Sequence, residues 1–213
     1  MLKEVINVLS LEEKVDPKHT ALIVVDVQND FCHSEGAFGR RGRDMSSVQS
    51  MVHTLVDLIA KARTANVPII FVRTSHGTWT NSDVWLERAK DVSVSEIPIC
   101  SDSSWGAEFY TVKPEPGDKI VVKHRYSAFY STDLDVVLKA RGIKTLVLTG
   151  VATNVCVETT ARDAYQRDYY VVLVDNCSAT FSIEDHQATL RNIRNHFGIV
   201  ATADEVVRAW SKR

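Results

Sequence analysis

The stretch KTLVLTGVATNVCVETTARDAY, residues 144–165, changes character halfway along. Its first half, up to Val151, is an apolar run without polar alternation, which is typical of a strand covered on both faces. From Thr153 onward, apolar residues recur at spacings of three and four, which predicts a helix. Cys156 lies where the strand gives way to the helix. Because buried strands that lead into helices build parallel sheets, this stretch indicates the fold class.

The same alternation recurs along the chain. Further strands are predicted at residues 20–27, 67–74, 118–124 and 169–176, with a short sixth strand at 198–203. Helices are predicted at residues 45–66, 131–142, 153–168, 182–198 and 204–213. Strands that alternate with helices indicate a parallel sheet between two helical layers. We therefore expect an α/β fold, a three-layer α/β/α sandwich with a mainly parallel, Rossmann-like sheet of five or six strands.

Composition bounds the number of domains and the class of partner. At 213 residues with 45% hydrophobic residues, the chain is long for one domain and short for two, and we expect residues 1–213 to form a single domain. A formal net charge of −2 gives no electrostatic case for nucleic acid or for an anionic membrane. Small-molecule substrates and protein partners remain.

No segment of the sequence predicts export or membrane insertion. Charges interrupt the first twenty residues, and no apolar run approaches the roughly 20 residues of a membrane helix. The cysteines lack paired spacing such as CxxC, so a disulfide framework is not expected. We therefore expect a reduced, cytoplasmic protein. The glycine-rich motifs that hold nucleotide phosphates are also missing, so no cofactor is expected.

Residues 75–117 break the rhythm of strands and helices. They contain Trp79, Trp85 and Trp105, three prolines and no long periodic element. A connection of this length in a compact domain is usually functional or disordered, and the tryptophans argue against disorder. We interpret the segment as a cover over one end of the sheet or at a subunit interface. A packed surface excursion is the equally weighted alternative.

Three reactive residues fall at the carboxyl ends of predicted strands. Asp26 ends the first strand, Lys123 ends the third, and Cys156 follows the fourth. Ligands of open parallel sheets bind at these ends. A charge in an aliphatic strand costs several kcal/mol unless it is paired, so we expect Asp26 and Lys123 to meet near the thiol. For either charged residue alone, solvation at the rim of the sheet is the alternative.

Cys156 has a local argument for reactivity. The helix that begins near Thr153 or Asn154 directs N–H groups and a partial positive charge at the thiol, which favours the thiolate. A nearby carboxylate raises the thiol pKa but can accept the proton as a general base. N–H groups of the same turn are the usual material of an oxyanion hole. For Cys100 and Cys177 we expect small buried hydrophobic side chains.

Three regions resemble the signature regions of the isochorismatase-like cysteine hydrolases. They are VVDVQNDF (24–31), KHRYSAF (123–129) and TGVATNVCVETTARDA (149–164). That superfamily includes nicotinamidases, N-carbamoylsarcosine amidohydrolase, biuret hydrolase and ureidoacrylate amidohydrolase. The stretch from residue 123 to residue 164 looks closest to the ureidoacrylate amidohydrolase and biuret hydrolase branch, which acts on small linear ureido or carbamoyl amides.

The resemblance implies a role for each reactive residue. Asp26 would be the acid and base, Lys123 the cation that stabilises the thiolate, and Cys156 the nucleophile. The family's cis peptide would fall between Val151 and Ala152, and the N–H groups of Ala152 and Cys156 would form the oxyanion hole. The implied activity is that of a cysteine-dependent amidohydrolase, which cleaves a C–N bond through a thioester and releases ammonia.

Residues 73–83, RTSHGTWTNSD, depart from the metal-dependent members of the superfamily. Metal-dependent nicotinamidases carry a pattern resembling DxHxxxxxH after the second strand. Here Thr74 replaces the aspartate, and His76 has no second histidine near it. A lone histidine does not make a stable metal site, so we expect no metal, and nicotinamide becomes less favoured as a substrate. His33 could pair with Asp30 at a metal, but a surface-loop histidine is the favoured interpretation.

Candidate substrate contacts come from the same motifs. Phe31 and Phe129 are predicted to form walls of the substrate pocket. The alternative for both is ordinary packing in the core. Gln28, Tyr126 and Asn154 are predicted polar contacts.

Polar residues just past Lys123 could recognise a carboxylate. The candidates are Arg125, Tyr126, Ser127 and Thr132, and the sequence does not distinguish among them.

Other activities stay open. The substrate could be nicotinamide or an N-carbamoyl amino acid, the acyl group could pass to an amine, or the chain could be a silent binding or assembly module, since a fold does not imply activity. The resemblance also implies a homo-oligomer, a dimer or tetramer, to which Trp210 and the tryptophans of residues 75–117 could contribute.

Overall fold

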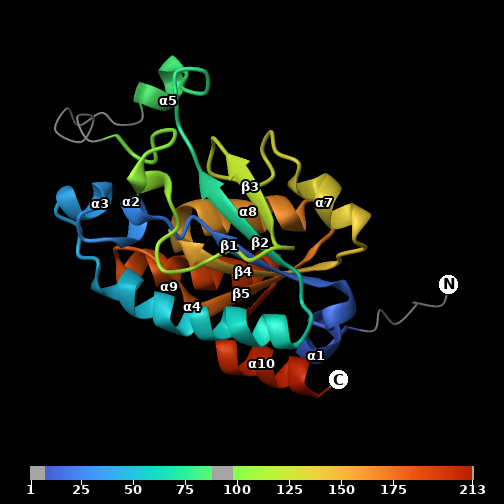
Figure 1. Ribbon diagram of the computed structural model, residues 1–213. Coiled ribbons are helices and arrows are strands. Elements are labelled where there is room, and N and C mark those ends of the chain that lie inside the picture. Colours follow the sequence, from blue (N-terminus) through green and yellow to red (C-terminus); the bar gives the residue numbers. More distant parts are fainter. Residues whose placement is uncertain (1–7, 88–97, 213) are drawn as a thin grey trace.

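Residues 8–87 and 98–212 are described here in a computed structural model of the chain. Six strands form one sheet in the order β3-β2-β1-β4-β5-β6, and every pairing is parallel (Figure 1). The strands are β1 (Thr20–Val25), β2 (Ile69–Thr74), β3 (Lys119–Lys123), β4 (Thr145–Val151), β5 (Tyr170–Ala179) and β6 (Ile199–Ala201). The predicted α/β fold is confirmed, with six strands.

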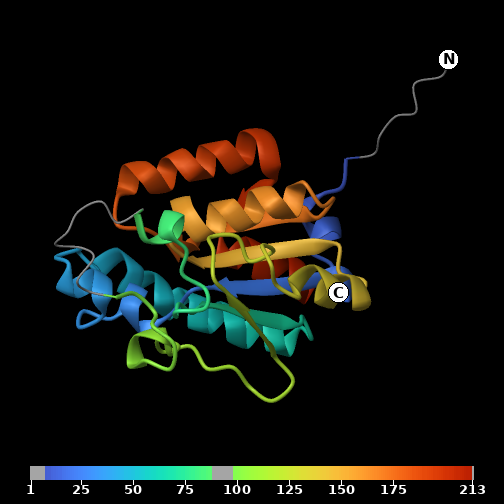
Figure 2. The ribbon, with the colours of Figure 1, turned by 90° about the horizontal axis from the view of Figure 1, so that it is seen from above.

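Helices cover both faces of the sheet (Figure 2). One layer holds α4 (Ser46–Thr64) and α10 (Ala203–Ser211), and the other holds α7 (Leu134–Ala140), α8 (Glu158–Tyr165) and α9 (Ile183–Asn192). Alternate residues of β1 divide between the two cores. Leu22 and Val24 belong to the core that includes α4, whereas Ala21 and Ile23 belong to the core that includes α7 and α8. Within the described ranges, no helix has the length and apolar character needed to cross a membrane.

Short helical elements connect these layers. They are α1 (Leu11–Lys14), η1 (Pro17–His19), α2 (Asn29–Cys32), α3 (Ala37–Arg40), α5 (Asp83–Glu87), η2 (Trp105–Ala107), η3 (Thr153–Val157) and η4 (Ile193–Phe197). The elements η3 and η4 are π-helical turns, one before α8 and one after α9. The predicted helices at 153–168 and 182–198 are therefore each composite, because apolar spacing of three and four does not distinguish an α-turn from a neighbouring π-turn.

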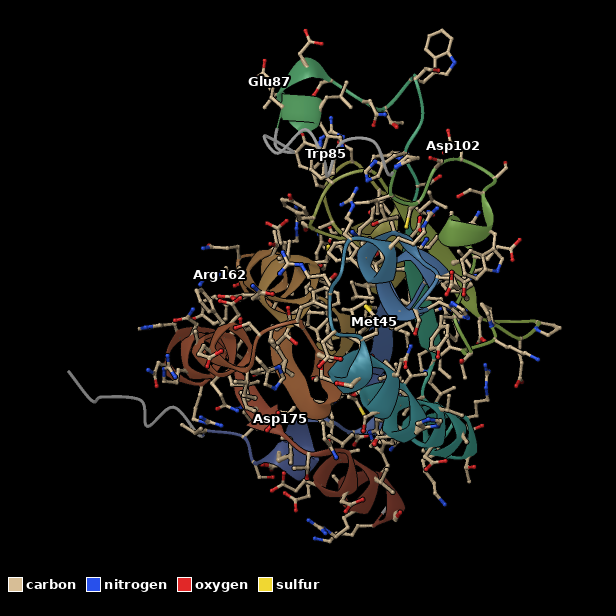
Figure 3. All side chains as sticks on the ribbon, turned by 90° about the vertical axis from the view of Figure 1, so that its left-hand side faces the viewer. Met45, Trp85, Glu87, Asp102, Arg162 and Asp175 are labelled. Carbon is tan, nitrogen blue, oxygen red and sulfur yellow. The ribbon has the colours of Figure 1, made fainter. Side chains whose placement is uncertain are left out.

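The excursion at residues 75–117 lies at the carboxyl end of the sheet, where α5 stands above β2 in Figure 1. Bridges tie it down: Gln28 pairs with Phe109, and His76 pairs with Ser101. Trp79 is 99% exposed, whereas Trp85 is half-buried and lies on the inner side of α5 (Figure 3). The part of this excursion at residues 88–97 lies outside the described residues. The described part covers one end of the sheet, which is one of the two roles that we predicted for it.

Candidate active site

The carboxyl ends of β1 and β3 and the turn after β4 bring the three reactive side chains together. The ammonium nitrogen Nζ of Lys123 lies 2.7 Å from Oδ2 of Asp26 and donates to Sγ of Cys156 at 3.4 Å. The side chains of Asp26 and Lys123 are each 1% exposed. Since β3 is separated from β1 by β2, the lysine side chain reaches across the end of β2 to meet the aspartate. A carboxylate, an ammonium and a thiol thus share one buried site.

Thr74, at the end of β2, connects Asp26 and Lys123 through its hydroxyl group. Its hydroxyl Oγ1 accepts from Nζ of Lys123 at 2.8 Å and donates to Oδ1 of Asp26 at 3.0 Å. Sequence reasoning noted Thr74 only as a departure from a metal motif. The signal that could have found it is its position as a polar residue at a strand end, directly between the strands that carry Asp26 and Lys123.

The backbone around Asp26 holds the carboxylate in an uncommon conformation. Asp26 has a φ of 52°, in the left-handed region that aspartate tolerates better than most residues. Its N–H donates to the carbonyl of Val72 at 2.9 Å, and its carbonyl accepts from the N–H of Gln28 at 2.8 Å. The chain therefore turns sharply at the end of β1, with the carboxylate buried beneath it.

Gly150 allows β4 to lie close to β1 just before the turn that carries Cys156. It has a φ of 110°, and a Cβ built there would lie 2.0 Å from the carbonyl oxygen of Val25. No side chain fits at that distance, so glycine is required at this position. Val25 precedes Asp26, and Gly150 precedes the turn that carries Cys156, so the close approach of the two strands also sets the spacing of the two reactive groups.

The turn after β4 carries Cys156. The peptide bond between Val151 and Ala152 is cis, at the bond where the resemblance implies it. The carbonyl of Ala152 accepts from the N–H groups of Val155 at 3.1 Å and Val157 at 3.2 Å, which closes the π-helical turn η3. Single π-turns are frequent at functional sites. Cys156 is 8% exposed, and its neighbours on the turn also line the cavity described below.

Burial controls the protonation of the thiol. It raises the pKa of Cys156 to about 12; the charge of Lys123 opposes the rise, and Asp26 adds to it through its charge and a hydrogen bond. For Lys123, burial would lower the pKa, but Asp26 and then Cys156 outweigh burial, so its pKa is raised. The site therefore holds a thiol beside an Asp26–Lys123 ion pair. The expectation that a nearby carboxylate raises the thiol pKa agrees with this, whereas the effect of the helix start on the thiol stays a prediction.

A cavity of about 240 Å³ opens beside Cys156. Phe31, Phe38 and Phe181 form aromatic walls, with the rings of Phe38 and Phe181 stacked at 4.9 Å between centroids. Trp85 of α5 lines the side that the excursion supplies. Among the described residues that line the cavity there is no aspartate or glutamate. The space is therefore small, mostly apolar, and lined in part by Cys156.

Three of the five predicted substrate contacts line this cavity, namely Phe31, Tyr126 and Asn154. Asn154 accepts from the hydroxyl of Thr180 at 2.8 Å, and both side chains face the space. Phe38, Trp85, Ile99 and Phe181 also line the cavity, and sequence reasoning missed them as contacts. They come from segments without a recognisable motif.

Gln28 and Phe129 are placed elsewhere, which corrects two predicted contacts. Gln28 is fully buried and donates to the carbonyls of Thr74 and Ala107, so its amide fastens the excursion to the sheet. Phe129 packs in the core against Tyr169, with ring centroids 5.9 Å apart. Gln28 follows Asp26 and Phe129 follows Lys123 closely in sequence, but neither side chain lines the cavity.

Metal-ligating residues do not gather in the described part of the chain. No group of three or more His, Cys, Asp or Glu side chains there could hold a metal ion. The carboxylate of Asp30, considered above with His33, accepts from the N–H groups of Ala37 at 2.8 Å and Cys100 at 2.6 Å. Thr74, at the position of the metal motif's aspartate, is bonded to Asp26 and Lys123. The donors at these positions do not fit a metal centre.

A second polar network holds the turn η3, which carries Cys156, on the side of α9. The imidazole of buried His186 lies with Nδ1 at 3.0 Å from Oγ1 of Thr153 and Nε2 at 2.8 Å from Oδ1 of Asp175. The carboxylate of Glu158 accepts from the hydroxyl of Thr189 at 2.6 Å, and this hydrogen bond joins α8 to α9. The same carboxylate also accepts from Arg162 within α8. Figure 3 shows Arg162 and Asp175 on the side of the molecule where these helices lie. The turn is thus anchored at its first residue.

Comparison with known proteins identifies the family. A family model described as "Isochorismatase domain" matches residues 20–205. The ureidoacrylate amidohydrolase RutB of Methylobacterium radiotolerans is 36% identical over 201 residues, covering 88% of this chain and 78% of that protein.

Solved structures agree with this assignment. A cysteine hydrolase from Pseudomonas syringae pv. phaseolicola 1448A is 31% identical with a TM-score of 0.82, covering 93% of this chain and 95% of that one. An N-carbamoylsarcosine amidase from Thermoplasma acidophilum is 28% identical with a TM-score of 0.71, covering 87% of this chain and 97% of that one. The chain belongs to the isochorismatase family.

Proposed function

We propose that this chain is a cysteine-dependent amidohydrolase that cleaves a C–N bond of a small linear amide, ureido or carbamoyl compound and releases ammonia. The observation that carries the proposal is the buried contact of Lys123 with both Asp26 and Cys156, at 2.7 Å and 3.4 Å, beside a small cavity. A nucleophile, a base and a cation within hydrogen-bond reach are the parts that covalent acyl transfer needs.

The first half of the proposed reaction forms the thioester. Asp26 takes the proton of the Cys156 thiol as Sγ attacks the carbonyl carbon of the substrate, and Lys123 stabilises the negative charge on sulfur. The N–H groups of Ala152 and Cys156 bind the oxyanion of the tetrahedral intermediate. As the C–N bond breaks, the proton held by Asp26 passes to the leaving nitrogen, and ammonia or an amine departs.

The second half returns the site to its starting state. Asp26 takes a proton from a water molecule, and the resulting hydroxide attacks the thioester carbonyl. The C–S bond breaks, and the proton returns to sulfur from Asp26. For a ureido substrate whose amine leaves in the first half, the second half releases carbamate, which decomposes to ammonia and carbon dioxide. A raised Cys156 pKa is consistent with this order, since the thiol must pass its proton to a base before it reacts.

Support for a ureido or carbamoyl substrate comes from size and relatives. The cavity of about 240 Å³ suits a short chain, and the names of similar proteins include a ureidoacrylate amidohydrolase and an N-carbamoylsarcosine amidase. Nicotinamide is a weaker candidate, because Thr74 stands where metal-dependent nicotinamidases carry an aspartate. We also propose assembly as a dimer or tetramer, for which exposed Val84 and Leu86 supply apolar surface on α5.

Ammonia release from a panel of compounds tests the proposal. The panel contains ureidoacrylate, 3-ureidopropionate, biuret, N-carbamoyl amino acids and nicotinamide. We expect turnover of at least one ureido or carbamoyl compound and its loss in Cys156→Ala, with Cys177→Ala, a buried core cysteine, as the matched control.

The covalent route is rejected if Cys156→Ala keeps more than a few per cent of the activity. A chain that releases ammonia from no member of the panel, and transfers no acyl group to added amines, would instead be a binding or assembly module.

A further inference from the structure

Arg125 brings a second cation to the cavity. It lies two residues after Lys123 and lines the same space as Cys156 and Tyr126. Its guanidinium carbon lies 4.8 Å from the ring centroid of Trp85, so the cation is held against an aromatic face. In residues 8–87 and 98–212, no carboxylate lies within ion-pair distance of this guanidinium. The charge of Arg125 is therefore not neutralised by those residues.

The other cation of the cavity, Lys123, already uses its hydrogen-bond donors within the protein. The ammonium of Lys123 is bonded to Asp26, Thr74, Cys156 and the carbonyl of Arg125. An ammonium has three N–H donors, so these contacts leave it no capacity for a distant group of the substrate. Anion recognition in the cavity consequently falls to Arg125.

The hydrogen bonds of Arg125 fix its position and leave donors over. Nη1 donates to the carbonyls of Thr80 at 3.0 Å and His124 at 2.7 Å, and Nη2 has a long contact of 3.4 Å with the hydroxyl of Ser82. A guanidinium carries five N–H donors. The Nε donor and one Nη2 donor have no bond to the described residues, and arginine binds carboxylates through two such donors.

Cavity size limits what can lie between the nucleophile and this cation. A volume of about 240 Å³ leaves room for a short molecule and excludes a large one. Two of the other residues named above as carboxylate candidates are engaged elsewhere. Ser127 donates to Asp163, and Thr132 donates to the carbonyl of Ala128.

We propose that Arg125 binds a carboxylate at the far end of the substrate, so that this protein acts on small ureido or carbamoyl acids in preference to neutral amides. The inference rests on the proposed amidohydrolase function and adds the charge of the substrate to it. The reacting carbonyl lies at Cys156, the apolar linker lies along the aromatic walls, and the carboxylate lies at the guanidinium stacked on Trp85.

A matched pair of substrates tests this inference. The acid is 3-ureidopropionate, and its neutral counterpart is 3-methylbutylurea, in which two methyl groups replace the carboxylate oxygens. We expect kcat/KM for the acid to fall about 10- to 100-fold in Arg125→Gln, mostly through KM, as for the loss of a charge-assisted hydrogen bond. For the neutral urea we expect a change of no more than about threefold.

Two further variants separate recognition from structure. Arg125→Lys keeps the charge without the paired donors, so its loss on the acid should be smaller than that of Arg125→Gln. Arg194→Gln removes an exposed arginine outside the cavity and should leave the preference for the acid unchanged. If Arg125→Gln lowers kcat/KM equally for both substrates, Arg125 merely holds Thr80 and Ser82 in place and the inference is wrong.

Binding to Cys156→Ala, measured by calorimetry, separates this inference from the proposed function. We expect 3-ureidopropionate to bind that variant more tightly than 3-methylbutylurea, and the difference to vanish when Arg125→Gln is added. Selective binding without any turnover by the unmodified protein would overturn the amidohydrolase proposal and leave the carboxylate site standing. Equal binding of both compounds would overturn the carboxylate site alone.

Discussion

Lys123 is 1% exposed and bonded to three neighbouring side chains, whereas Trp85, across the same cavity, is half-buried on a helix of five residues. We call the first group, Asp26, Thr74, Lys123 and Cys156, the inner wall. The second group, Trp85, Arg125 and Tyr126, is the outer wall. The inner wall comes from strand ends and the turn after β4, and the outer wall comes from α5 and the loop after β3.

The difference between the walls separates two tasks. In the inner wall, each polar atom is positioned by another, and rigid strands supply the exact spacing that proton transfer and attack on a carbonyl need. In the outer wall, aromatic and cationic side chains lie on connecting segments, where changes in sequence are tolerated more easily. Substitutions in the inner wall should therefore act on turnover and stability, and substitutions in the outer wall should act on KM.

The largest effect is expected from Lys123→Met. Asp26 would keep a buried charge without its cation, so the free energy of unfolding should fall by about 3–5 kcal/mol. Turnover should fall by about a thousandfold or more, as for the loss of one member of a catalytic group. Urea unfolding and ammonia release measure the two effects.

The double variant Lys123→Met with Asp26→Asn is the control for this change. It removes both charges, and asparagine tolerates the left-handed backbone at position 26, so most of the lost stability should return. Activity should stay absent. If activity returned together with stability, the lysine would have only a structural role.

The next effect is expected from Asp26→Asn alone, which should make the Cys156 thiol more reactive while ammonia release is lost. The carboxylate raises the pKa of Cys156, so its removal lowers that pKa and increases the thiolate fraction at any pH below it. Alkylation by iodoacetamide near pH 7 should therefore become faster, by about tenfold for each unit by which the pKa falls, while ammonia release is lost.

In the unmodified protein, alkylation of Cys156 should be slow near pH 7 and should rise with pH, because the thiol is protonated below a pKa of about 12. Fast labelling that is independent of pH near neutrality would show that the helix start and Lys123 outweigh burial. Slower labelling in Asp26→Asn would show that the carboxylate is not what holds the proton on sulfur.

The smallest effect is expected in the outer wall, from Trp85→Leu. Loss of the aromatic face behind Arg125 should raise KM for a ureido acid by about three- to tenfold, which is a cation–π contribution of about 1 kcal/mol. The value of kcat should not change. Trp79→Leu, at a tryptophan that is 99% exposed, is the matched control and should alter neither constant. A fall in kcat in Trp85→Leu would show that the two walls are coupled.

Sequence patterns predicted the inner wall far better than the outer wall. Asp26, Lys123 and Cys156 could be found because each is a reactive residue at the end of an apolar strand, and parallel topology brings such ends to one edge. The contacts of Thr74 with Asp26 and Lys123 were not predicted, because a threonine in a strand gives no signal until its neighbours are known. In the outer wall, Arg125 and Tyr126 could be named as candidates because they follow Lys123 closely, whereas Trp85 could not, since it lies on a segment whose path depends on tertiary packing.

The wrong predictions share one physical cause. Gln28 and Phe129 are close in sequence to Asp26 and Lys123, but closeness along the chain does not fix the direction of a side chain past the end of a strand. Cys100 and Cys177, predicted as buried apolar side chains, are both 0% exposed.

Gly150 gives the active site a vulnerability that no reactive group displays. A single methyl group at that position would push the carbonyl of Val25 away and widen the gap between β1 and β4. The carboxylate of Asp26 follows β1 and the sulfur of Cys156 follows β4, so both groups would be displaced although neither would be changed chemically. Inactivity caused by a substitution there would resemble the loss of a catalytic residue, although position 150 supplies nothing but the absence of a side chain.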